Sequence, residues 1–445
     1  MNRNMNAKWT KIKIIASSAL FVSAFLALIA GVNAANPKWR PLYTAALFAP
    51  TDGSSTNTGA LFPAIDASST NLDPRLFREG STTVYDSSSN RIILFGGFSA
   101  GVVKMGILQK PALNDVWILT NANGTEMNGT GTVPSTWSKL NPNAPSGFPE
   151  IRYHHSAVYD GAHHRMIIYG GCTAGCAPIA NDVWILSNAD NVQGPATWQQ
   201  LPTMGVPPGK REGHQAVYDP GTNSMIVWAG TDGEGLGFCG SHAYSNVFVL
   251  SNANGLDGPV GNWTKLLPTG TPPAGESFST AVYDVTNNIM IVFGGSGNVV
   301  ISGIKNCQST NAVSTLSNAN GMDPGPSKWT KLAPQGQVPP TREQHVAVYE
   351  PPPSNTMTIF GGYLTDHKAG HPRTLRGDTW KLSNANGMGG TPVWTQLIAS
   401  GTDPSGPAPS FRWNGGTIDT ANRVMMFGGS SNDGPLWSTW LLDGP

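Results

Sequence analysis

Arginine, histidine and glutamate recur together at one position of a repeated segment, and these residue types suit anion binding or acid–base chemistry. Each arginine but the last stands seven residues before a tyrosine; several copies carry a glutamate directly after it and a histidine three residues on. Guanidinium groups bind carboxylates in a bidentate manner, and a histidine beside a carboxylate can transfer a proton on a bound sugar. The candidate ligand-binding residues are Arg78, Arg152, Arg211, Arg342, Arg412, His155, His214, His345, Glu212 and Glu343.

The same repetition allows a structural explanation, because an Arg-x-x-His motif present in most copies could simply link neighbouring units through Glu79, Glu212 and Glu343 or through backbone carbonyls. In the fourth copy Glu276 and Ser279 replace the arginine and the histidine, which predicts a lopsided pocket rather than a uniform ring. A ligand-binding role and a structural role therefore both stay open, and no residue is assigned to catalysis, to a metal or to a cofactor.

The elements that position these residues are short strands in a unit repeated about every 65 residues. The clearest copy runs from Arg152 to Leu201 and has four apolar runs separated by turn residues. A double glycine, or Ala-Gly in one copy, follows the second run at Gly96, Gly170, Ala229, Gly294, Gly361 and Gly428. A Ser/Thr-Asn-Ala-Asn-Gly turn follows most third runs. Asparagine and glycine favour such turns, and a calcium loop is the alternative, although it would have few carboxylates.

A tryptophan closes the unit in only five of the six copies: Trp137, Trp198, Trp263, Trp329 and Trp394. The matching sixth lies near the start of the chain, at Trp39, whereas the last copy stops at Leu442 without a fourth strand. The N-terminal segment is therefore expected to complete the last unit, as in a ring of sheets that leaves no open edge.

A double glycine after the second strand, an aromatic residue in the third and a tryptophan in the fourth are similar to kelch repeats. The resemblance covers residues 37–442 and implies an all-β, six-bladed kelch-type β-propeller of four-stranded antiparallel blades, with the N-terminal strand closing the last blade. The amino-acid sequence of the repeat resembles that of secreted bacterial kelch proteins, a group with no single activity. Arginines at this repeat position form the binding surface in some kelch proteins, so the resemblance also implies a ligand site.

The N-terminus has the plan of a secretory signal peptide: basic residues, an apolar run from Ile14 to Gly31, and small residues before a cut expected after Ala34. An uncleaved membrane anchor is the alternative. Cleavage predicts a secreted, periplasmic or cell-surface protein of residues 35–445, a monomer with no membrane span. The cut removes four basic residues and leaves a net charge of about −4, which argues against nucleic-acid binding.

Four cysteines in an exported chain predict two disulfides. Cys172 and Cys176 share one loop, while Cys239 and Cys307 occupy corresponding loops of adjacent units. We therefore expect the pairs Cys172–Cys176 and Cys239–Cys307. A metal site is not expected, since no ordered histidine partner accompanies the close cysteine pair.

Long loops on one face of the ring, including a polar insertion over 43–77, lie on the same side as the arginine positions, where binding sites are commonly built. The leading hypothesis is a binding module for an extracellular ligand, either an anionic glycan or a protein. The alternatives are a carbohydrate-active enzyme resembling a sugar-acid mutarotase, which is less favoured, and a structural or adhesive surface protein. His163 and His164, in a turn on the opposite face, are expected to be solvated.

Overall fold

The computed structural model describes residues 37–43, 78–99, 102–104, 107–109, 112–128, 131–173, 178–233, 243–273, 276–301, 304–364, 374–399, 416–418, 424–431 and 434–443. The predicted signal peptide, almost all of the 43–77 insertion, Cys176, Cys239 and Arg412 lie outside these residues. Within the described part of the chain, every regular element is a strand, and no helix long and apolar enough to cross a membrane is found.

Five blades are each built from one continuous stretch of chain, with four antiparallel strands ordered from the centre outwards. Blade 1 consists of β3 (Thr82–Asp86), β4 (Arg91–Phe95), β8 (Val116–Thr120) and β11 (Thr136–Leu140). Blade 2 consists of β13 (Ser156–Asp160), β14 (Arg165–Tyr169), β16 (Val183–Ser187) and β17 (Thr197–Leu201). Blade 3 consists of β19 (Gln215–Asp219), β20 (Ser224–Trp228), β21 (Val247–Ser251) and β22 (Gly261–Leu266). Blade 4 consists of β24 (Thr280–Asp284), β25 (Ile289–Phe293), β28 (Val313–Ser317) and β29 (Lys328–Lys331), and blade 5 of β31 (Val346–Glu350), β32 (Thr356–Phe360), β35 (Thr379–Ser383) and β36 (Val393–Ile398).

Short strands decorate these blades without changing their order. The strands β18 (Thr203–Gly205) and β30 (Gln335–Gly336) add in parallel to the outer edges of blades 3 and 5. Small sheets outside the blades are β2 (Arg78–Glu79) with β5 (Phe98–Ser99), β6 (Val102–Lys104) with β7 (Ile107–Gln109), β9 (Met127–Asn128) with β10 (Gly131–Thr132), β12 (Arg152–Tyr153) with β15 (Cys172–Thr173), β33 (Tyr363–Leu364) with β34 (Thr374–Leu375), and β23 (Glu276–Ser277) with β26 (Ser296–Ile301) and β27 (Ile304–Ser309).

A further four-stranded sheet joins the two ends of the chain. It consists of β37 (Gly416–Ile418), β38 (Val424–Ser431), β39 (Gly434–Asp443) and, on the outside, β1 (Lys38–Tyr43). Strand β1 pairs antiparallel with β39, with Trp39 opposite Leu442, which confirms that the N-terminal segment completes the last sheet.

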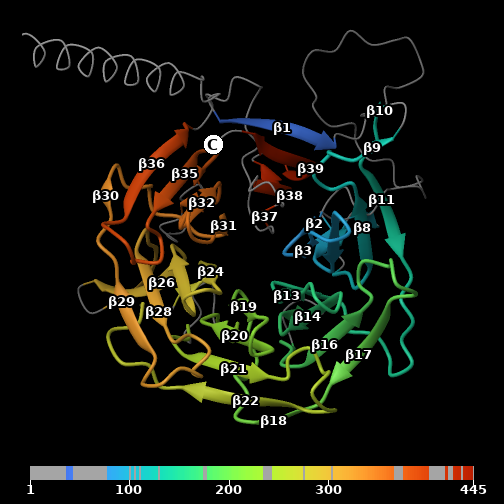
Figure 1. The fold of residues 1–445 in the computed structure, drawn as a ribbon, viewed down its shortest axis with the longest axis horizontal. Coiled ribbons are helices and arrows are strands. Elements are labelled where there is room, and N and C mark those ends of the chain that lie inside the picture. Colours follow the sequence, from blue (N-terminus) through green and yellow to red (C-terminus); the bar gives the residue numbers. More distant parts are fainter. Residues whose placement is uncertain are drawn as a thin grey trace, which may run out of the picture.

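The sheets stand around a common centre (Figure 1), and their inner strands contact one another in the order β3, β13, β19, β24, β31 and β37; β37 also contacts β3. The fold is therefore an all-β propeller, as predicted. Five blades are established as continuous units, against the six that the repeat predicted, because the remaining sheet draws its strands from both ends of the chain.

The core is divided into layers between neighbouring blades. One layer, for example, packs Ile167 and Tyr169 of blade 2 against Met225, Phe248 and Trp263 of blade 3. In the four layers between blades 1 to 5, the outer-strand tryptophan of one blade packs against the aromatic residue that ends the second strand of the preceding blade. The pairs are Phe95–Trp198, Tyr169–Trp263, Trp228–Trp329 and Phe293–Trp394, with ring centroids 4.6–5.2 Å apart. Trp39 makes the same contact with Phe360 of blade 5, at 4.9 Å, so β1 occupies the position that the repeat assigns to a fourth strand.

Candidate functional site

The repeated arginines are buried in ion pairs within their own blades. Arg78, Arg152 and Arg342 are 0–1% exposed and bind Asp115, Asp182 and Asp378 in a bidentate manner, with the nitrogen–oxygen distances between 2.7 and 3.0 Å. Each Nη1 also donates to the carbonyl of the first residue of the double glycine. Burial would raise the pKa of these aspartates, but the arginine hydrogen bonds and charges outweigh it and hold each pKa below its usual value.

The other two units support this structural role. In unit 4, Glu276 replaces the arginine and Ala312 replaces the aspartate, so both partners of the pair are absent together. In unit 3, Arg211 meets Asn246 at 3.2 Å, donates to the carbonyls of Ala229 and Pro208, and lies over the ring of Tyr244. The four described guanidinium groups that were candidates for anion binding are thus engaged inside the blades, and the geometry favours the structural explanation for them.

The histidines of the motif join neighbouring blades. Nε2 of His155, His214 and His345 lies 2.7, 2.9 and 2.7 Å from the hydroxyl oxygens of Thr82, Ser156 and Thr280, each on the inner strand of the preceding blade. The histidines also pack closely against the double glycines: a Cβ on Gly170 would lie 3.0 Å from the ring atom Cε1 of His214, and a Cβ on Gly171 would lie 2.7 Å from Cβ of His155. The double glycine and the histidine are therefore two halves of one contact between blades.

One residue before each histidine position, the chain turns through the left-handed region in all five blades. The residues are Gly80, His154, Gly213, Phe278 and Gln344, with φ between 55° and 65°. From His154 to Gln344, the N–H of each donates to the carbonyl of its counterpart in the preceding blade, at 2.8–3.1 Å. The left-handed conformation costs a non-glycine residue about 1–2 kcal/mol. Such strain commonly concentrates at functional sites.

We call this set of residues the mouth ring. It borders a cavity of about 240 Å³ at the start of the inner strands, lined by residues of all five blades. His154, Phe278 and Gln344 line it together with His155, His214 and His345, whereas none of the described arginines does. The repeat therefore presents three different side chains at equivalent backbone positions around one cavity.

Several polar groups of the cavity have no hydrogen-bond partner among the described residues. They are the Ser81 and Ser279 hydroxyls and both amide atoms of Gln344, in side chains that are 2–6% exposed. Leaving a buried polar group unsatisfied costs about 1–3 kcal/mol. The cavity is thus lined by uncharged donors and acceptors that are available to a polar molecule.

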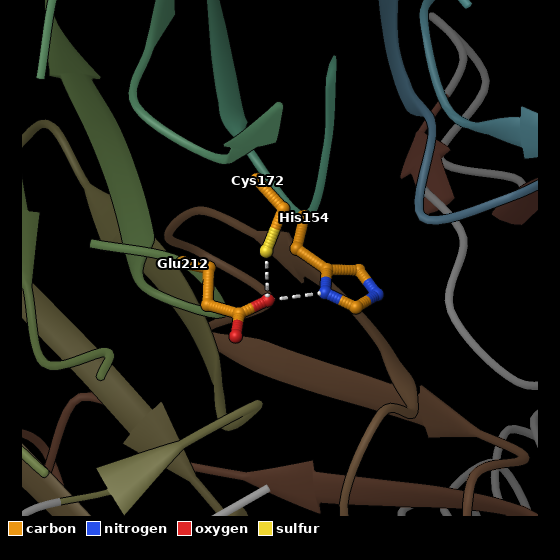
Figure 2. A group of neighbouring side chains, drawn as sticks. All are labelled: His154, Cys172 and Glu212. Carbon is orange, nitrogen blue, oxygen red and sulfur yellow. Dashed lines mark hydrogen bonds and ion pairs between the residues drawn. The ribbon is translucent and has the colours of Figure 1, made fainter. Parts of the chain in front are cut away.

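The wall of the cavity near blade 2 is held by Glu212. Its Oε2 lies 2.7 Å from Nδ1 of His154 and 2.7 Å from Sγ of Cys172 (Figure 2). His154 packs edge to face on Phe278, with ring centroids 5.2 Å apart. No described cysteine is a free thiol, so the three residues do not offer a thiolate ligand to a metal. Glu212 therefore holds His154 in its orientation.

Burial controls the charge of the cavity histidines. Burial, assisted by the charge of the arginine three residues earlier in the chain, lowers the pKa of His214 to about 3 and the pKa values of His155 and His345 well below their usual range. These imidazoles are neutral near pH 7, which leaves the cavity without a cationic histidine of this set.

Lowering the pH below about 6.5 should destabilise the protein through these histidines. The unfolded chain takes up a proton at His214 near pH 6.5, whereas the folded protein does so only near the lowered pKa of about 3, so stability falls as the pH decreases between these values. We expect His214 to contribute a loss of up to about 1.4 kcal/mol between pH 6.5 and 5.5. Urea unfolding of wild type and His214→Gln at both pH values measures this, and an identical pH dependence of the two proteins would contradict it.

Some predicted residues stay untested. Glu343 is buried beside Gln344, and its backbone pairs with Tyr363. The disulfides Cys172–Cys176 and Cys239–Cys307 and the candidate Arg412 involve residues or side chains outside the described set, so they remain predictions. His163 is half-exposed, as expected, but His164 is not solvated: its side chain is 14% exposed and lies between two aspartates.

None of the mouth-ring residues was among the candidates predicted from the sequence. The signal for the ring is the residue two positions after each repeated arginine, or after Glu276 in the fourth unit, which is glycine in two units and therefore suggests a left-handed turn in all of them. The unlike residues at that position, histidine, phenylalanine and glutamine, could then have been identified as the variable lining of a common site.

Comparison with known proteins supports the fold alone. No family model matches the chain. A solved structure with a similar chain is described as "Cryo-EM structure of RAG in complex with one melted RSS and one unmelted RSS"; the match has a TM-score of 0.51 at 13% identity and covers 84% of this chain and 98% of that chain. At this identity the similarity extends to the β-propeller architecture and not to an activity.

Proposed function

We propose that the protein is an exported kelch-type propeller that binds an extracellular ligand in the cavity at its mouth ring. The sheet shared by both ends of the chain is, in this proposal, a sixth blade, supported by the contact of β37 with both β31 and β3 and by the repeat contact of Trp39. The propeller then acts as a rigid scaffold that places unlike side chains around one cavity.

The observation that carries the proposal is the buried amide of Gln344, which has no partner among the described residues although it lines the cavity. The described arginines of the motif are already engaged, and the histidines are neutral, so an uncharged polar group suits the cavity better than an anion. A volume of about 240 Å³ is below the usual range for drug-sized ligands. It fits a single sugar ring of a glycan or one side chain inserted by a protein.

A thermal-shift panel of neutral monosaccharides, sugar acids and acidic peptides tests the proposal, because a molecule that binds the native state raises the melting temperature. We expect a shift with one neutral sugar class. Gln344→Leu should weaken its binding about 10- to 100-fold through the lost hydrogen bonds. Gln199→Leu, the same change at an exposed outer-strand position, should leave the affinity unaltered. A shift with sugar acids alone that persists in Gln344→Leu would contradict this site and favour the arginines as the ligand-binding residues.

A further inference from the structure

A cluster of titratable side chains lies on the opposite face of the propeller, where blade 2 departs from a hydrogen-bonding pattern that blades 3, 4 and 5 share. In blades 3, 4 and 5 an asparagine stands in the turn between the first and second strands, at Asn223, Asn288 or Asn355. Its side-chain N–H donates to Oδ1 of the second asparagine in the turn after the third strand. That second asparagine then donates its amide to the aspartate that ends the inner strand of the preceding blade, in the pairs Asn254–Asp160, Asn320–Asp219 and Asn386–Asp284, at 2.6–2.7 Å.

Blade 2 replaces both asparagines. His164 stands at the inner-turn position, with a φ of 53° that matches the 48° of Asn223, and Asp190 stands at the second position. The backbone contact of the motif is kept, since the N–H of Ala189 donates to the carbonyl of His164 at 2.9 Å, as that of Ala253 does to Asn223 at 3.0 Å. Asp190 therefore faces Asp86 of blade 1 with a carboxylate in place of an amide donor.

Two buried carboxylates converge on one imidazole nitrogen. Nδ1 of His164 lies 3.0 Å from Oδ2 of Asp86 and 3.1 Å from Oδ2 of Asp190, and the two aspartates are 1% and 0% exposed. This nitrogen carries at most one hydrogen, so it can satisfy only one of the two oxygens. Oδ2 of Asp190 has no hydrogen-bond donor among the described residues.

We propose that Asp86, His164 and Asp190 bind a divalent metal ion between blades 1 and 2, with Zn²⁺ as the best match. One imidazole and two carboxylates suit zinc and neighbouring transition metals better than calcium, which prefers six to eight oxygen ligands. Two ligand atoms at about 2.1 Å from one tetrahedral zinc ion are about 3.4 Å apart. The observed separations of 3.0 and 3.1 Å are a few tenths of an ångström shorter, so the three ligand atoms already lie close together and need to move apart only slightly to admit the ion.

The neighbouring groups hold the three residues in place. The Tyr159 hydroxyl donates to Oδ2 of Asp86 at 2.9 Å, and the Ser88 N–H and hydroxyl donate to Oδ1 at 2.8 and 2.7 Å. The Gln193 amide lies 2.8 Å from Nε2 of His164. Since the amide nitrogen and oxygen are interchangeable at this contact, Gln193 can accept the Nε2 hydrogen and leave the Nδ1 lone pair facing the carboxylates. The Arg91 guanidinium binds the Asp190 main-chain carbonyl and so fixes the backbone of this ligand.

Restoring the asparagines of the repeat gives a sharp test. The protein is stripped with EDTA and titrated with ZnCl₂ by calorimetry, and its melting temperature is measured with and without zinc. For wild type we expect a tight site and a rise of several degrees. The double variant His164→Asn/Asp190→Asn should bind zinc at that site at least 100-fold more weakly and lose the rise. Its metal-free melting temperature should equal or exceed that of wild type, which shows that the variant folds.

His163→Asn is the matched control, since the neighbouring His163 is 52% exposed and is not one of the three ligands. It should retain the tight zinc site. Equal zinc binding by wild type and the double variant would overturn the proposal. So would a wild type that zinc does not stabilise, because that result would make the cluster only a contact between blades.

Discussion

Replacing Arg342 with methionine should lower the free energy of unfolding by about 3–5 kcal/mol, because it leaves Asp378 as a buried charge without its bidentate partner. Asp378 is 4% exposed and, among the described side chains, its carboxylate would keep the Trp380 indole as its hydrogen-bond donor. The guanidinium also donates to the carbonyls of Gly361 and Pro340, which would lose these bonds. The effect should be much larger than that of a surface ion pair, which contributes about 0–1 kcal/mol.

Urea unfolding at pH 7 measures this loss, with Lys331→Met as the control because Lys331 is exposed on the outer strand of blade 4. The double variant Arg342→Met/Asp378→Leu should recover part of the stability, since it removes both charges together. A variant Arg342→Met that unfolds like wild type but no longer binds a sugar acid would instead support the ligand-binding alternative.

Replacing Trp39 with alanine should cost about 3–5 kcal/mol and weaken the closure of the ring. Trp39 is fully buried, its indole N–H donates to Thr379 at 3.1 Å, and it packs with Phe360, Val346, Val348, Ile398 and Leu442. It therefore joins the first strand of the described chain to blade 5. On the other side of the same sheet, Leu441 packs against Ile92, Leu94 and Trp117 of blade 1, so the sheet links both neighbours.

Urea unfolding combined with size-exclusion chromatography checks this prediction. If β1 loosens, β39 becomes an exposed edge that can pair with another molecule, so the variant should also form oligomers. Lys38→Ala, one residue earlier and exposed, should do neither. A loss below about 1 kcal/mol with no oligomers would show that the ring does not depend on the N-terminal strand.

The arginine motif shows which part of the candidate site could be predicted from the sequence and which part could not. Its spacing placed Arg78, Arg152, Arg211 and Arg342 at equivalent positions, and both a structural and a ligand-binding role were open. The deciding partners, such as Asp182 for Arg152, stand directly before the third strand of the same blade, 30 residues away. No pattern within either segment can show that this carboxylate binds the arginine.

The sequence by itself determined the strands, the turns and the closure by Trp39, because alternation, glycine pairs and turn residues act over a few neighbouring positions. Only the tertiary structure decided what lies between blades. The mouth ring, the histidine contacts with the preceding blade and the meeting of Asp86 with His164 and Asp190 depend on how one sheet packs on the next. His164, read as a solvated turn residue, is enclosed because the turns of two blades come together there, a proximity that no local pattern encodes.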